Sequence, residues 1–226
     1  MSVELTIDTA SDMASVALSQ EGTLVAELTW RCPRNHSAQL LPTLEYLMQR
    51  AGVDNSDLTA IFVCIGPGSY TGLRVGMSTA KGLAFALGLP IVGVGRLEAD
   101  AHQHNDYRGP ICAVHRAGRG ELAWAVYQGT ASAWREMIPP RLSLPQGLLA
   151  EKRLKNALFC GEVSDDLAES LREALGPKTP VVGPAASIRR AATVAELAWR
   201  RLASGDTDDA ASLKPIYLRE AVVAPP

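Results

Sequence analysis

Two short stretches carry side chains that could bind a phosphate group and its magnesium ion. Asp8 and Thr9 stand at the end of a β-rich run, and Gly66, Gly68 and Ser69 lie in a glycine-rich turn after a second apolar run. Oxygen ligands suit magnesium, and glycines let an anion approach the main chain at the start of the next helix. We predict a weak nucleotide- or phosphate-binding site at these residues. The alternative is two turns that bond their own backbone, with a serine or threonine capping the helix.

The glycine-rich turn matches no standard catalytic or phosphate motif. No lysine follows its last glycine as in a Walker A loop, and its spacing differs from the dinucleotide fingerprint. Ser69 lies in G-P-G-S-Y-T-G, which lacks the G-x-S-x-G elbow of a nucleophile. The four histidines form no helical pair four residues apart that would hold a metal. We therefore predict no catalytic and no metal-binding residue.

The helix expected after this turn, over residues 71–87, has small residues on one face. Interior glycines destabilise a helix by roughly 0.5–1 kcal/mol each relative to alanine, so several together indicate a close neighbour. That neighbour is either a helix of the same chain or a partner protein, and we favour the partner. The predicted partner interface consists of Leu40 and Leu44 on an expected helix over 37–51, and Thr71, Gly72, Val75, Gly76, Thr79, Ala80 and Leu83.

Alternating and continuous apolar runs indicate the elements that position these residues. In the first half, strands at 3–8, 14–18, 23–30, 61–65 and 91–94 and helices at 37–51, 71–87 and from 96 onward give the order βββαβαβα. In the second half, strands at 111–114, 121–127, 133–138, 157–160 and 181–182 and helices at 145–154, 164–175 and 187–202 repeat it.

This repeated order predicts two similar lobes. The polar, turn-forming segment 104–109 marks the junction, so we expect an N-terminal lobe over 1–104 with the partner interface. The C-terminal lobe, over 105–226, is expected to be a reduced copy whose final segment is able to pack back on the first lobe.

Composition limits the possible partners and compartment. The 226 residues are 47% hydrophobic with a net charge of −2, so the chain has a core but no general attraction for phosphate backbones. Four widely spaced cysteines indicate free thiols in a reducing compartment. No apolar run approaches the ~20 residues of a membrane span. We expect a cytoplasmic protein without membrane contact.

Five motifs together resemble one known family. These are LTIDTAS (5–11), CPRNHSAQLLP (32–42), GPGSYTGLRVG (66–76), GLPIVGVGRLEA (88–99) and PIYLR (215–219). They resemble the TsaB (YeaZ-type) family of tRNA threonylcarbamoyladenosine biosynthesis, over almost all of the first ~100 residues. The resemblance implies an α/β fold of two RNase H-like lobes of the actin-like ATPase (ASKHA) superfamily. It also implies a non-catalytic paralogue that supports a TsaD-type catalytic subunit, alongside a TsaE-type ATPase.

Two departures locate the chemistry outside this chain. The catalytic paralogue carries a metal-binding H-x-x-x-H where this sequence has Arg96 and Asp100, and a guanidinium cannot replace an imidazole ligand. The second lobe of the family usually begins IDAR-x-GEVY. Here AVHRAGRGELAW (113–124) has His115 for the acid and one extra residue, so no phosphate role is expected of the loop from His115 to Glu121.

We therefore expect a scaffold that forms a homodimer when alone and reaches tRNA only through the complex. No cofactor is expected to be required, although ATP or ADP with magnesium at an interface stays open. The enzyme alternatives are an active ASKHA-type ATPase or sugar kinase and a peptidase, for which no metal pair or nucleophile is present. Gly76→Arg is expected to abolish partner binding and leave the isolated chain folded, with Leu83→Glu as a second probe.

Overall fold

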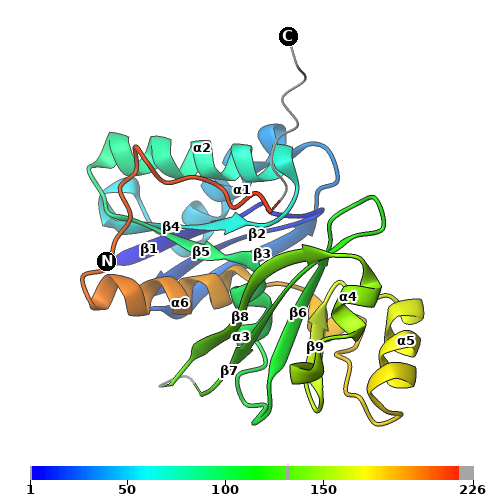
Figure 1. The fold of residues 1–226 in the computed structure, drawn as a ribbon. Coiled ribbons are helices and arrows are strands. Elements are labelled where there is room, and N and C mark those ends of the chain that lie inside the picture. The colour runs from blue at the N-terminus through cyan, green and yellow to red at the C-terminus, as the bar shows by residue number, and fades with distance from the viewer. Residues whose placement is uncertain (1, 131–132, 219–226) are drawn as a thin grey trace. The chain divides into compact units, whose positions relative to one another are not determined.

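The computed structural model describes residues 2–130 and 133–218, and Figure 1 shows its elements in chain order. The strands are β1 (Val3–Asp8), β2 (Met13–Gln20), β3 (Thr23–Arg31), β4 (Leu58–Gly66), β5 (Ile91–Gly95), β6 (Ile111–Arg116), β7 (Leu122–Gln128), β8 (Arg135–Ser143) and β9 (Leu158–Gly161). The α-helices are α1 (His36–Ala51), α2 (Tyr70–Leu87), α3 (Arg96–His102), α4 (Pro145–Leu149), α5 (Asp165–Leu175) and α6 (Ala191–Ala203). Short 3-10 turns occur at Asn55–Asp57, Lys152–Leu154 and Pro184–Ser187.

The chain divides into two compact units. The first consists of Met1–Ala99 and Ile188–Pro215, and the second contains Asp100–Ser187. The sequence-based division at 104/105 assigned everything after that point to one lobe. In the structure, the segment with α6 belongs to the first unit instead, because α6 packs on β1, β2, β3 and β5.

The first unit is a five-stranded sheet in the order β3-β2-β1-β4-β5. β1 pairs antiparallel with β2 and parallel with β4, so that Leu5 stands opposite Leu18 on one side and Ile61 on the other. Helices α1 and α2 cover one face of this sheet and α6 covers the other (Figure 1). All six residues of β1 are buried, as expected for a central strand covered on both faces.

One hydrophobic core joins the sheet to α1 and α2. Its buried members come from β1, β2, β4 and β5, from Val53, from Leu40, Leu44 and Leu47 of α1, and from Met77, Ala80 and Ala84 of α2. The three- and four-residue spacing within each helix places these side chains on one stripe. α1 ends at Gly52 and α2 at Gly88, both in the left-handed conformation.

The second unit repeats only part of the predicted order. Its four strands run β8-β7-β6-β9, with β6 antiparallel to β7 and parallel to β9. The strand expected at 181–182 is reduced to a single bridge between Val181 and Phe159. Because the closing helix lies in the first unit, the full βββαβαβα order holds there and not in the second unit.

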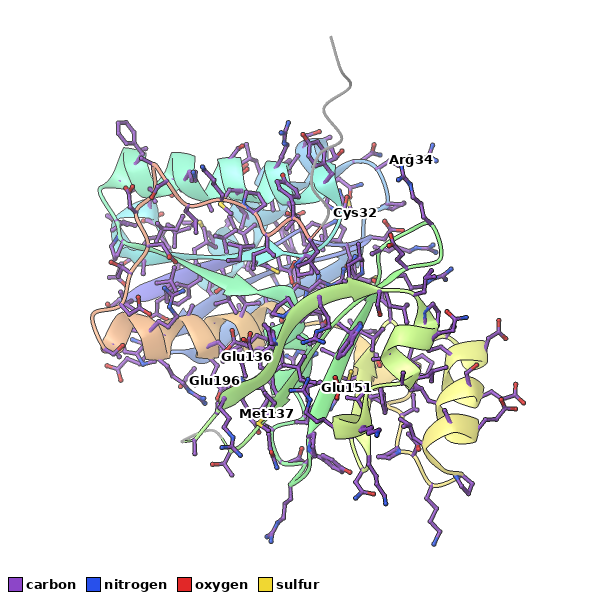
Figure 2. The ribbon with its side chains drawn as sticks, in the orientation of Figure 1. Cys32, Arg34, Glu136, Met137, Glu151 and Glu196 are labelled. Atoms are coloured by element: carbon purple, nitrogen blue, oxygen red, sulfur yellow. The ribbon has the colours of Figure 1, made fainter. Side chains whose placement is uncertain are left out.

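The cysteines are buried and free. Cys32 follows β3 in the segment labelled in Figure 2, where Arg34 extends away from the ribbon, and it is 1% exposed. Cys64, Cys112 and Cys160 lie within strands, and burial raises the pKa of each of these three thiols.

Among the residues that the structure describes, no helix is both long and apolar enough to cross a membrane.

All four thiols should therefore resist modification in the native protein. All four are buried away from the reagent, and the raised pKa of Cys64, Cys112 and Cys160 also leaves these three with almost no thiolate, which is the reactive form. With Ellman's reagent at pH 8, we expect less than one thiol per chain to react within minutes. Four should react after unfolding in guanidinium, which serves as the control for total thiol. Rapid reaction of two or more native thiols would show that this core opens readily.

Candidate functional site

The predicted site residues meet at one edge of the first sheet. β1, β4 and β5 run parallel, so their carboxyl ends lie together, and ligand sites of open α/β sheets form at this edge. Asp8 is the last residue of β1, the glycine-rich turn follows β4, and Arg96 follows β5. The sequence-based grouping of Asp8 with the Gly66–Gly72 turn is thus reproduced in space.

The Asp8 carboxylate is fully buried and bound from within the chain. Arg189 donates from Nη2 to Oδ1 at 3.0 Å and from Nε to Oδ2, and the backbone N–H of Ala10 donates to Oδ1 at 2.9 Å. Burial alone would raise the pKa of Asp8. The charge and hydrogen bonds of Arg189, with smaller contributions from Ala10 and Arg96, outweigh it and lower the pKa of this carboxyl below its ordinary value.

Thr9 and Ser69 serve the fold of the turn. Thr9 donates from Oγ1 to the carbonyl of Gly72 at 2.7 Å, and the N–H of Ser69 donates to the carbonyl of Ala10 at 2.8 Å. Ser69 caps α2 by accepting from the N–H of Gly72 at 3.2 Å. This capping role was one of the two sequence-based alternatives.

The glycines are required by close packing inside the chain. A Cβ atom on Gly68 would overlap the carbonyl oxygen of Ala10, one on Gly72 the carbonyl oxygen of Thr9, and one on Gly76 the hydroxyl of Thr9. The close neighbour predicted from these glycines is therefore the turn after β1, and neither another helix nor a partner. Gly76→Arg would force its side chain into this contact, so we now expect this variant to destabilise the fold as well as to affect binding.

Most of the predicted interface residues face the chain's own core. Leu40, Leu44, Gly72, Gly76 and Ala80 are buried, so they offer a partner no surface. Thr71 is exposed, while Val75, Thr79 and Leu83 are partly exposed. Val75 and Leu83 also pack against the core, which makes Leu83→Glu a probe of stability as well as of binding.

A groove with a mixed apolar and polar lining runs between α1 and α2. It has a volume of about 520 Å³ and is lined by Leu41, Leu44, Glu45, Met48 and Gln49 of α1, by Leu83 of α2, by the segment at 53–58 and by Leu5 beneath. Leu41, which lines this groove, is 57% exposed, and Tyr70 and Phe85 are large exposed apolar residues elsewhere on α2. Exposed apolar area of this kind marks protein interaction sites. Leu41 is absent from the predicted interface, because the spacing of apolar residues on this helix does not tell a buried leucine from an exposed one.

In the second unit, His115 occupies the position equivalent to Asp8, near the end of the central strand β6. Its Nδ1 lies 3.0 Å from Glu162 Oε2, and the same oxygen accepts from the N–H of Arg116 at 3.0 Å. The departure seen at His115 thus places a hydrogen-bonded pair where the first unit has its carboxylate.

Arg96 and Asp100, at the positions of the catalytic paralogue's histidine pair, lie four residues apart on α3 and are each 2% exposed. Within residues 2–130 and 133–218, no three His, Cys, Asp or Glu side chains come together as metal ligands would. Arg189 is the site residue that the sequence did not reveal, since it belongs to no motif and lies 181 positions from Asp8.

Comparison with known proteins gives consistent matches. The family model for TsaD, tRNA N6-adenosine threonylcarbamoyltransferase, matches residues 30–225. The tRNA threonylcarbamoyladenosine biosynthesis protein TsaB of Bacillus subtilis is 31% identical over 219 residues, which is 96% of this chain and 94% of that protein. YeaZ from Pseudomonas aeruginosa has a TM-score of 0.80 at 28% identity, covering 96% of this chain and 100% of that structure.

A more distant likeness concerns the fold alone. A ROK hexokinase from Thermus thermophilus has a TM-score of 0.51 at 12% identity, covering 89% of this chain and 99% of that structure. The predicted α/β fold of the actin-like ATPase type is therefore confirmed, as is the resemblance read from the five motifs. The TsaD family model also matches most of its length, and the chain belongs to the TsaB family of tRNA threonylcarbamoyladenosine biosynthesis proteins.

Proposed function

We propose that this chain is a non-catalytic scaffold subunit that binds a TsaD-type catalytic subunit. In this complex, the TsaD-type subunit transfers a threonylcarbamoyl group to tRNA. The observation that carries the proposal is the groove between α1 and α2, whose lining includes the exposed side chain of Leu41 beside Leu44, Met48 and Leu83. A surface of this kind gains stability by burial against a partner.

The chemistry of the described residues supports a role without catalysis. Asp8 is neutralised by Arg189, Thr9 donates to the main chain, and Arg96 stands where the paralogue has a metal ligand. Transfer chemistry is therefore assigned to the TsaD-type subunit, with a TsaE-type ATPase as a further component. Contact with tRNA is assigned to the complex, because the chain has a net charge of −2. Without its partner, the chain pairs with a second copy through the same groove.

The test is reconstituted tRNA modification by TsaD-type and TsaE-type proteins with and without this chain. We expect the TsaD-type protein to co-elute with the chain in size-exclusion chromatography. Formation of the modified adenosine, measured by mass spectrometry of digested tRNA, should fall at least tenfold when the chain is left out. Modification at the full rate without the chain would contradict the scaffold role.

A further inference from the structure

The carboxyl edge of the first sheet is where this fold would bind a magnesium nucleotide. Three parallel strands end there, and Asp8 is the acidic residue with which the central strand β1 ends. A magnesium ligand must have a carboxylate oxygen free to face the ion and its waters. Whether Asp8 fits that role depends on what its two oxygens already bind.

Both oxygens of Asp8 are engaged by groups of the same unit. Arg189 forms a two-point contact with them, and Ala10 donates to Oδ1 at 2.9 Å. Arg189 also donates from Nη2 to the hydroxyl of Ser11 at 3.3 Å. The Asp8 side chain is fully buried and Arg189 is 5% exposed, so no oxygen of Asp8 faces solvent.

The local charge opposes a divalent cation. Arg189 neutralises Asp8, and Arg96, itself 2% exposed, adds a second buried guanidinium whose charge acts on Asp8. A magnesium ion at Asp8 would displace Arg189 from the carboxylate and would then lie close to two cations in a region of low dielectric. The residues present do not fit a magnesium nucleotide at Asp8.

We propose that Arg189 takes the place of the magnesium nucleotide at this edge, and that the Asp8–Arg189 ion pair fastens the segment 188–190 to the first sheet. Arg189 is the second residue of the segment with which the chain re-enters the first unit. The pair thus fixes the point from which α6 starts, and α6 covers one face of the sheet. This inference does not depend on the proposed scaffold role.

The second unit gives a parallel observation. Its central strand ends near His115, which is also paired internally, with Glu162 at 3.0 Å. In both units, therefore, the residue near the end of the central strand is bound by another part of the same unit. A phosphate-binding site in a fold of this type would need a free side chain at this position.

Arg190 supplies a matched control for the test. It neighbours Arg189 and also forms an ion pair across the chain, with Glu27 at 2.6 Å, but its own side chain is 54% exposed. The Glu27 side chain is 8% exposed, and without Arg190 it would still accept from the N–H of Ala192 at 3.0 Å. Removing one partner of a buried ion pair leaves an uncompensated charge, whereas exposed pairs contribute little. In urea unfolding, Arg189→Met should lower the equilibrium constant for folding at least about a hundredfold. Arg190→Met should lower it by less than about fivefold.

A double variant separates charge from packing. Asp8→Asn with Arg189→Met removes both charges, so it should regain at least about tenfold of the folding constant lost in Arg189→Met. If Arg189→Met alone cannot be purified folded, the double variant decides, since the proposal expects it to fold. Equal stability of Arg189→Met and Arg190→Met, or failure of the double variant to fold, would overturn the fastening role.

Magnesium ATP is the second probe. Isothermal titration of the full chain with 1 mM ATP and 5 mM magnesium chloride should give no heat that differs between wild type and Asp8→Asn. Binding by wild type that Asp8→Asn abolishes would overturn the proposal, even if the scaffold role holds. If the scaffold role fails but no Asp8-dependent binding is seen, the proposal for the Asp8–Arg189 pair still holds. The two proposals can therefore fail separately.

Discussion

Gly72→Ala should lower the free energy of unfolding by about 3 kcal/mol, although the same change at Gly82 should raise it. Both glycines lie within α2. At Gly72 a Cβ atom would overlap the carbonyl oxygen of Thr9, which is backbone and cannot rotate away. The added carbon must push α2 from the turn after β1, and it also strains the bond from Thr9 Oγ1 to the carbonyl of Gly72.

Gly82 is the matched control on the same helix. Nothing lies within 4 Å of the position of its Cβ atom, so alanine there should gain about 0.5–1 kcal/mol from helix propensity alone. Urea unfolding followed by circular dichroism at 222 nm measures both. A Gly72→Ala protein as stable as wild type would mean that the turn after β1 can move away, and the packing account of the glycines would be wrong.

Sequence patterns predicted the first unit well because its signals are local. Continuous apolar runs marked buried strands, and three- and four-residue spacing marked α1 and α2. The predicted limits of α1 (37–51) and α2 (71–87) each differ from the observed limits by one residue. β8 was expected to end at 138 but continues through Pro139 and Pro140. An edge strand tolerates proline because its outward N–H groups need no partner, and β8 is an edge strand of its sheet.

The contacts that were missed join distant parts of the chain. The glycines correctly indicated a close neighbour, but only the fold shows that this neighbour is Thr9. Arg189 could not be linked to Asp8, since one arginine looks like any other without the fold that buries it. The reassignment of α6 to the first sheet has the same origin, because an amphipathic stripe predicts a buried face but not the surface that covers it.

Partner binding should depend on Leu41 and not on Tyr46. Both are large apolar residues of α1 with more than half of their surface exposed, but Leu41 lines the groove and Tyr46 does not. Glutamate at Leu41 would remove an apolar side chain from the groove and add a second charge beside Glu45, where a partner side chain has to be desolvated. We expect Leu41→Glu to weaken binding of a TsaD-type subunit at least about tenfold, as for loss of an apolar anchor.

Tyr46→Glu adds the same charge to the same helix, so its binding constant should stay within about threefold of wild type. Neither change touches the core, and equal urea midpoints for the three proteins exclude unfolding as the cause. Biolayer interferometry with the immobilised TsaD-type subunit gives the affinities. Equal weakening by both variants would point to a general effect of charge on α1. Weaker binding by Tyr46→Glu alone would place the interface on another side of α1. If the partner binds in the groove, substitutions of the residues that line it must reduce the affinity most.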